Sequence, residues 1–271
     1  MTRWSFFDGR PLIRFAGAAL VAAGLLLAPA AFAHPDLIAQ INGLSERIQA
    51  EPENVEWLIR RGDLHRRHED YAAAAQDFEA ARTLEPDHPE IDFYQGRLAR
   101  ETANFAAAAR SLDRYLAANP QHPSAWRLRA ETALGQGESC RAADAFESAV
   151  RYSKAPSPAL FRQWVLALLA AGDRPRALAA VDAGLERVGV EVSLLGLGAD
   201  TALADRDAGR AHSYLNRLPA GLASRPPWSQ RLTEADCLAE QSGVPANGSG
   251  GCAAGASARL DAQLQSVLGP K

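Results

Sequence analysis

The sequence predicts an all-α solenoid, in which helical hairpins repeat along the chain and stack side by side. Three observations lead to this prediction. When the 271-residue chain is aligned with itself at an offset of 34 residues, small and large apolar residues recur in register. Apolar residues near both ends follow helical spacing, and proline recurs where one unit would end. Because such a unit cannot bury its apolar face alone, each is expected to pack against its neighbours.

Each unit places small residues where two antiparallel helices would cross, because a bulky side chain there would overpack the crossing by about 1 to 3 kcal/mol. Large residues fill the space between units, and truncating a buried Phe to Ala typically costs about 3 to 5 kcal/mol. The small positions are Gly62, Gly96, Ala130, Ala74, Ala108, Ala142, Ala177, Ala211, Ala81 and Ala149, the large positions are Tyr71, Phe105, Phe78, Leu112 and Phe146, and the prolines are Pro86 and Pro120. One inserted residue near Pro156 to Pro158 lengthens the interval between Ala142 and Ala177 to 35 residues.

This pattern resembles the tetratricopeptide repeat (TPR) family, whose unit is a 34-residue helix-turn-helix. The family order of small, aromatic, alanine, large, small and proline is met in the first unit by Gly62, Tyr71, Ala74, Phe78, Ala81 and Pro86. The resemblance extends from Val55 to about Pro219 and implies a right-handed solenoid with a concave groove. Two residues depart from the pattern, because Arg61 stands where leucine is usual and Ser139 where an aromatic residue is usual.

The chain is expected to divide into a signal segment, a capping helix, five repeats and a C-terminal region with a degenerate sixth repeat, a glycine-rich stretch and a closing helix. The expected boundaries are 1–33, 34–54, 55–219 with units at 55–88, 89–122, 123–157, 158–191 and 192–219, and 220–271. Within the end regions, helices are expected over residues 36–50, 226–242 and 256–268. A stack of repeats needs such closure at its ends to stay soluble.

The first 33 residues read as a secretory signal peptide. Three arginines precede an apolar core from Phe15 to Leu27, and Ala31-Phe32-Ala33 matches a cleavage site. The core is shorter than the roughly 20 residues needed to cross a bilayer, so removal is expected rather than membrane anchoring. The sequence therefore predicts a periplasmic or secreted protein that is not embedded in a membrane and begins at His34 after cleavage.

Charge and motifs narrow the function. Without the signal segment, 26 basic residues face 31 acidic ones, whereas a nucleic-acid-binding protein would show a basic excess. The chain contains no nucleophile elbow, P-loop or dinucleotide fingerprint. We therefore expect no catalysis, no cofactor and no nucleic-acid partner.

The resemblance implies that first helices of the repeats line a concave face that binds a protein or peptide. The residues expected there are Ile59, Asp63, Arg66, Phe93, Arg97, Arg100, Arg127 and Glu131. The arginines among them could grip a carboxylate or phosphate; the alternative is a solvated face of mixed charge. The later first helices carry Leu166, Leu169 and Leu203 instead, so this half of the groove is apolar and is a candidate for filling by the C-terminal segment.

Further hypotheses concern metal binding, a structural role and the cysteines. His34 would offer an amine and an imidazole to copper, and the alternative is that cleavage simply leaves a histidine there. A structural role, in which the apolar half of the groove takes a neighbouring chain, is a further alternative. Cys237 and Cys252 are expected to form a disulfide that closes a loop, or else to be two unpaired thiols, whereas Cys140 is expected to be a small apolar filler.

Overall fold

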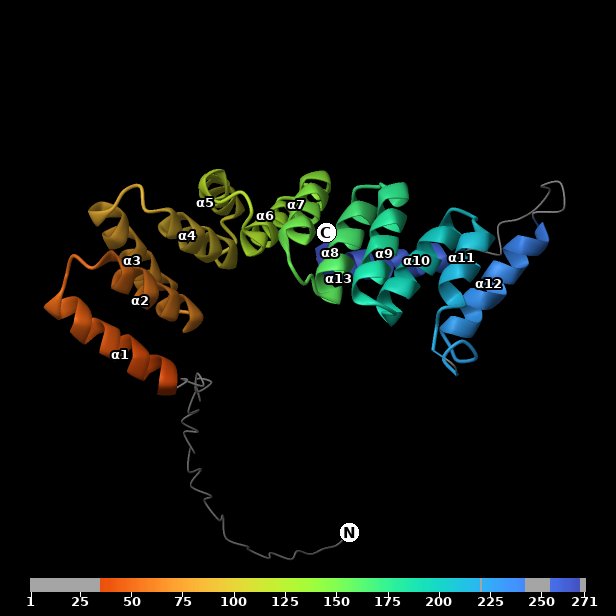
Figure 1. The fold of residues 1–271 in the computed structure, drawn as a ribbon, viewed down its shortest axis with the longest axis horizontal. Coiled ribbons are helices and arrows are strands. Elements are labelled where there is room, and N and C mark those ends of the chain that lie inside the picture. The colour runs from red at the N-terminus through yellow and green to blue at the C-terminus, as the bar shows by residue number, and fades with distance from the viewer. Residues whose placement is uncertain (1–34, 220, 242–253, 269–271) are drawn as a thin grey trace, which may run out of the picture.

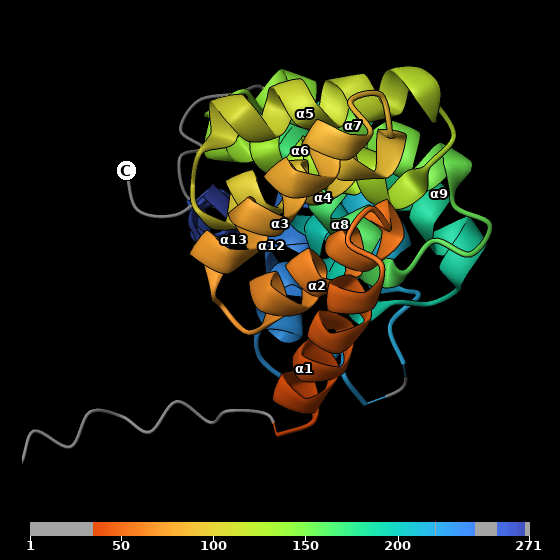
Figure 2. The same cartoon turned by 90° about the vertical axis from the view of Figure 1, so that its left-hand side faces the viewer.

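The computed structural model of the chain describes residues 35–219, 221–241 and 254–268. This part of the chain contains thirteen α-helices and no strand. The helices form an elongated row, with α1 (Pro35–Ala50) at one end and α12 (Trp228–Gln241) at the other (Figure 1). Viewed from the α1 end, the later helices lie behind α1 and α2 (Figure 2). The protein is therefore an all-α solenoid, as the sequence predicts.

Ten of the described helices form five consecutive hairpins. The hairpins are α2 (Val55–Arg67) with α3 (Tyr71–Leu84), α4 (Pro89–Glu101) with α5 (Phe105–Ala118), α6 (Pro123–Gly135) with α7 (Ser139–Tyr152), α8 (Pro158–Ala170) with α9 (Arg174–Val188), and α10 (Val192–Ala204) with α11 (Ala208–Leu215). Every first helix has 13 residues. The remaining helix, α13 (Ala254–Leu268), lies against α8 and α10.

The turn inside each hairpin has one residue in the left-handed backbone region, and these residues keep the period of the sequence. They are Glu69, Ala103, Gly137, Gly172 and Arg206, separated by 34, 34, 35 and 34 residues. In four of the five hairpins the next residue is an aspartate or asparagine whose side chain accepts a hydrogen bond from the first turn of the second helix. The inserted residue between the third and fourth units therefore leaves the turn geometry intact.

Close packing of the two helices of a hairpin depends on the small positions. A Cβ atom on Gly62 would lie 2.5 Å from Cε1 of Phe78, and one on Gly198 would lie 2.9 Å from Cε2 of Tyr214. Such distances leave no room for a methyl group unless the ring moves. Eight alanines at the small positions are 0% exposed, namely Ala74, Ala81, Ala108, Ala130, Ala142, Ala149, Ala177 and Ala211.

The core is larger in the C-terminal half of the solenoid than in the N-terminal half. One cluster of buried residues runs from Ala130 to Leu260, whereas the earlier repeats hold smaller clusters. Within the large cluster, every residue of α10 from Leu194 to Leu203 is buried. A helix that is apolar all round must be covered on all sides, and α10 contacts α8, α9, α11, α12 and α13.

The substitution Gly62→Ala is expected to destabilise the protein by about 1 to 3 kcal/mol, because the new methyl group would overlap the Phe78 ring. Gly43→Ala is the matched control: Gly43 lies inside α1 with nothing within 4 Å of a Cβ, and alanine is the better helix former. Urea denaturation followed by circular dichroism measures both variants. Equal stability of the two would contradict this description of the crossing.

Candidate binding groove

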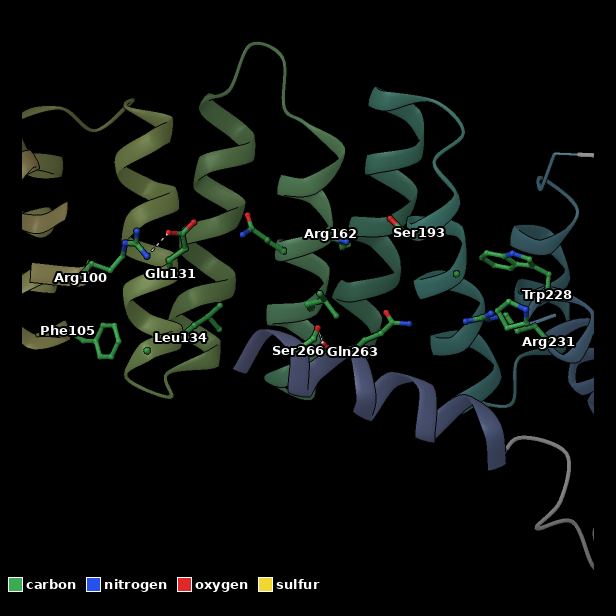
Figure 3. A pocket seen from close by; sticks show the side chains of 15 residues that line it. Arg100, Phe105, Glu131, Leu134, Arg162, Ser193, Trp228, Arg231, Gln263 and Ser266 are labelled. Atoms are coloured by element: carbon green, nitrogen blue, oxygen red, sulfur yellow. Dashed lines mark hydrogen bonds and ion pairs between the residues drawn. The ribbon is translucent and has the colours of Figure 1, made fainter. Parts of the chain in front are cut away.

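First helices of the hairpins form the inner face of the solenoid. Successive first helices contact one another, α2 with α4, α4 with α6 and α8 with α10. A cavity of about 770 Å³ lies along this face, lined by residues from α4, α6, α8 and α10 and bounded at its C-terminal end by α12 and α13. Figure 3 shows Arg100 at one end of the cavity, Arg231 at the other, and Gln263 and Ser266 of α13 along its edge.

Two of the arginines expected in the groove share one aspartate. Arg66 Nη2 lies 2.8 Å from Asp63 Oδ1, and Arg97 Nη1 lies 3.3 Å from the same oxygen. Arg66 Nη1 also lies 2.6 Å from Oε1 of Glu101, in the next repeat. The Arg66 side chain is only 7% exposed, and its ion pairs join Asp63 of α2 to Glu101 of α4. Arg66 therefore joins two repeats and offers little surface to a partner.

The other two arginines share one glutamate. Arg127 Nη1 lies 2.6 Å from Glu131 Oε1, and Arg100 Nη1 lies 3.4 Å from Oε2 of the same residue. Arg100 thereby links α4 to α6. An anionic ligand at these arginines would have to compete with Glu131, so this end of the groove has the mixed charge that the sequence left open as an alternative.

Arg97 is less fully compensated than Arg66. Burial, followed by the positive charge of Arg66, lowers the pKa of Arg97, although the nearby carboxylates oppose this shift. Its guanidinium carbon lies 5.7 Å from the ring centroids of both Phe93 and Tyr94. A carboxylate that bound beside Arg97 would oppose this pKa shift, as Asp63 and Glu101 do.

Ile59 lies in the core rather than in the groove. Its side chain is 1% exposed and belongs to a cluster with Leu58, Ala81 and Ile91. The side of α2 that carries it meets α3 and α4, so the expectation that Ile59 contacts a partner is wrong. Phe93 is half-buried, with its ring centroid 5.0 Å from that of Tyr115, and it contributes to packing as well as to the groove.

The C-terminal end of the groove is built around a buried carboxylate, Asp200 of α10, whose side chain is 0% exposed. Arg231 of α12 donates hydrogen bonds to both of its oxygens, from Nε at 2.9 Å and from Nη2 at 2.6 Å. Arg259 of α13 donates from Nε at 2.7 Å, and its Nη2 donates to Glu234 of α12 at 2.6 Å. One carboxylate therefore ties α12 and α13 to the last repeat.

The sequence reasoning missed this cluster because its arginines lie outside the repeat pattern. One signal was present: Asp200 is the only charged residue in the stretch VSLLGLGADTALA, which otherwise reads as fully buried. A buried charge requires a partner. An aspartate in this stretch therefore predicts a basic partner on a helix packed against it.

Helix α13 occupies the apolar half of the groove, which confirms the predicted filling by the C-terminal segment. Ala256 and Leu260 are buried in the same cluster as α8 and α10, and Leu264 packs against it. Leu169 of α8 lines a small cavity together with Leu260 and Leu264. The groove is thus divided into a part filled by α13 and a free part toward α2.

Two cysteines, Cys140 and Cys237, lie within the described residues. Cys237 of α12 is disulfide-bonded, and Cys252, its predicted partner, lies outside the described residues. Cys140 is a free thiol near the start of α7 and is exposed, so the expectation that it fills an apolar gap is wrong. Cys140 lies in the first turn of α7, with its side chain exposed.

His34 also lies outside the described residues. Among the residues that the structure describes, no group of three or more His, Cys, Asp or Glu is arranged to hold a metal ion. In the same part of the chain, no helix is both long enough and apolar enough to cross a membrane.

The fold defines a helical repeat protein of the class that serves as protein-interaction scaffolds. The tetratricopeptide repeat profile matches residues 46–89, 59–105 and 93–158. Over residues 46–158 the chain is therefore a tetratricopeptide repeat protein. None of the curated proteins matches it.

Solved structures share the fold over longer stretches of the chain. PilW, described as a type IV pilus biogenesis factor, is 21% identical and aligns with 73% of this chain and 92% of its own, with a TM-score of 0.54. PilF of Pseudomonas aeruginosa is 15% identical over 75% of this chain and 90% of its own, with a TM-score of 0.55. YrrB, described as a TPR protein with an unusual peptide-binding site, is 14% identical over 64% and 89%, with a TM-score of 0.55.

The substitution Asp200→Asn is expected to destabilise the C-terminal region by about 3 to 5 kcal/mol, because it leaves Arg231 and Arg259 without their buried counter-charge. Since each repeat contacts mainly its neighbours, the N-terminal repeats should stay folded. Limited proteolysis with mass spectrometry should then show faster cleavage within α12 and α13 only.

Asp113→Asn is the control. Asp113 pairs with Arg129 at 2.7 Å but is 57% exposed, so this substitution should change stability by less than about 1 kcal/mol. Matching cleavage patterns in the two variants would refute the buried role of Asp200.

Proposed function

We propose that the protein is exported and acts as a non-catalytic scaffold that holds a segment of a partner protein in the free part of its groove. The observation that carries this proposal is the position of α13. A helix of the chain itself lies on the inner face, held by apolar contacts to α8 and α10 and by the ion pair between Arg259 and Asp200. The inner face is therefore a surface on which a chain segment can dock.

The free part of the groove offers the means for a second segment to bind. It contains Arg97 and Arg100, whose guanidinium groups can donate charge-assisted hydrogen bonds, and Arg97 lies next to the aromatic rings of Phe93 and Tyr94. The cavity of about 770 Å³ is in the range of pockets that enclose a drug-sized ligand, which suits a short peptide segment. Concave repeat surfaces collect many such contacts without a deep active site.

Export is part of the proposal because of the first 33 residues. The basic start, the apolar core and the Ala31-Phe32-Ala33 site together form the pattern that signal peptidases process. The partner would then be met in the periplasm or outside the cell.

Photo-crosslinking in living cells tests both parts of the proposal. A photoreactive residue replaces Arg127, whose side chain is 45% exposed beside the groove, or, as the control, Arg151 on the second helix α7, which is 63% exposed. Both arginines pair with a glutamate four residues away, so the two replacements remove equivalent ion pairs. Mass spectrometry of the products identifies the crosslinked protein. It also determines the N-terminal residue of this chain, which shows whether the signal segment has been removed.

The expected result is a discrete adduct from position 127 only, in the exported fraction, on a chain that begins at His34. Identical adducts from positions 127 and 151 would rule out the groove as the binding site. An adduct on a cytosolic chain that begins at Met1 would rule out export.

A further inference from the structure

The cavity beside α13 has an excess of positive charge. Its charged lining residues are three arginines, Arg100, Arg162 and Arg231, and one glutamate, Glu131. Glu131 is already shared by Arg100 and Arg127. Because Asp200 compensates the charge of Arg231, the positive charge that remains in the lining is that of Arg162 of α8.

Arg231 has a hydrogen-bond donor without a partner. Its Nε and Nη2 bind Asp200, but its Nη1 is buried and bonds to no atom of the described residues. The residue is 5% exposed, and its guanidinium carbon lies 4.7 Å from the ring centroid of Trp228, which holds it in place. A buried donor left without a partner costs free energy, so an acceptor that reached it would be favoured.

Arg162 supplies the uncompensated charge beside this donor. It is exposed on α8 and makes no ion pair within the described residues. Glu191 interacts with Arg162 electrostatically, and its side chain accepts hydrogen bonds from Leu194 N at 2.7 Å and from Ser193 Oγ at 2.6 Å. Because Glu191 caps α10, it does not neutralise Arg162 through a direct contact.

Neutral residues complete the lining. Gln163 of α8, Gln263 of α13 and Ser193 of α10 place hydrogen-bonding groups around the arginines. Trp228 and Leu166 provide apolar surface in the same cavity. Figure 3 shows Ser193, Arg231 and Gln263 around this space, on α10, α12 and α13, and Arg162 of α8 also lines it.

We propose that this end of the cavity binds an acidic segment of a partner protein, with Arg162 and Arg231 holding an aspartate or glutamate carboxylate and with a neighbouring apolar side chain against Trp228 and Leu166. The inference rests on the proposed scaffold function and adds the chemical class of the bound segment. The site is composite, because α12 and α13 contribute to it as well as the repeats. Carboxylate and guanidinium form the strong, paired hydrogen bonds that such a site requires.

Isothermal titration of the full processed chain with two blocked hexapeptides tests the inference. One peptide alternates Asp and Leu, and the other alternates Asn and Leu, so that only the negative charge differs. The Asp peptide should bind about tenfold more tightly, or better. Arg162→Gln should lower its affinity by about the same factor, whereas Arg151→Gln on the outer face should leave the affinity unchanged.

Arg231→Lys is the second variant, because lysine keeps a positive charge beside Asp200 but removes the unpartnered Nη1. It should weaken binding of the Asp peptide. Because lysine cannot reproduce both hydrogen bonds to Asp200, circular dichroism checks that the variant is folded, and Arg162→Gln tests the same carboxylate without disturbing Asp200. Equal affinity for the Asp and Asn peptides would overturn the inference. Displacement of the Asp peptide by inorganic phosphate at an equal concentration would also overturn it, since the site would then hold small anions rather than a peptide. Crosslinking from position 127 detects a bound partner whatever the charge of its bound segment. A crosslinked partner together with equal affinity for the two peptides would therefore overturn the acidic-segment proposal and leave the scaffold function standing.

Discussion

The structure depends on a close approach of two helices inside the hairpin, where a glycine on the first helix faces a large residue on the second. Gly62 faces Phe78, Gly96 faces Leu112 and Gly198 faces Tyr214. In the first two hairpins both positions recur at an interval of 34 residues, so these hairpins pack with a similar geometry. These glycines therefore set how closely the two helices of a hairpin pack, and this packing determines where the first helices that line the groove lie.

The C-terminal region closes the solenoid by a different interaction. Repeat stacks usually end with a helix whose outer face is polar, and α12 lies in that place against α11. Here the chain continues, and α13 enters the groove, where Arg259 meets the fully buried Asp200. Buried ion pairs contribute little net stability but strongly disfavour arrangements that leave one charge unpaired. Asp200 therefore fixes where α12 and α13 lie rather than adding greatly to the stability of the fold.

The sequence predicted the helical architecture because each crossing joins residues 16 apart in one unit, and a period of 34 makes such pairs visible. It could not predict which side chains the inner face exposes. Ile59 and Arg66 occupy groove positions by register, yet both are buried by the adjacent repeat. The Asp200 cluster joins residues 31 and 59 apart from three elements, and no periodicity marks such contacts. The residues proposed to bind a partner belong to this second kind.

The central claim is that a helix of the chain itself occupies the C-terminal half of the groove. Amide hydrogen exchange with mass spectrometry over residues 254–266 tests it most directly. An isolated peptide of this length forms little stable helix in water, so slow exchange requires docking. If α13 is docked, its amides should exchange at least about tenfold more slowly in the full chain than in the isolated peptide. Equal exchange rates in the chain and in the peptide would contradict the claim.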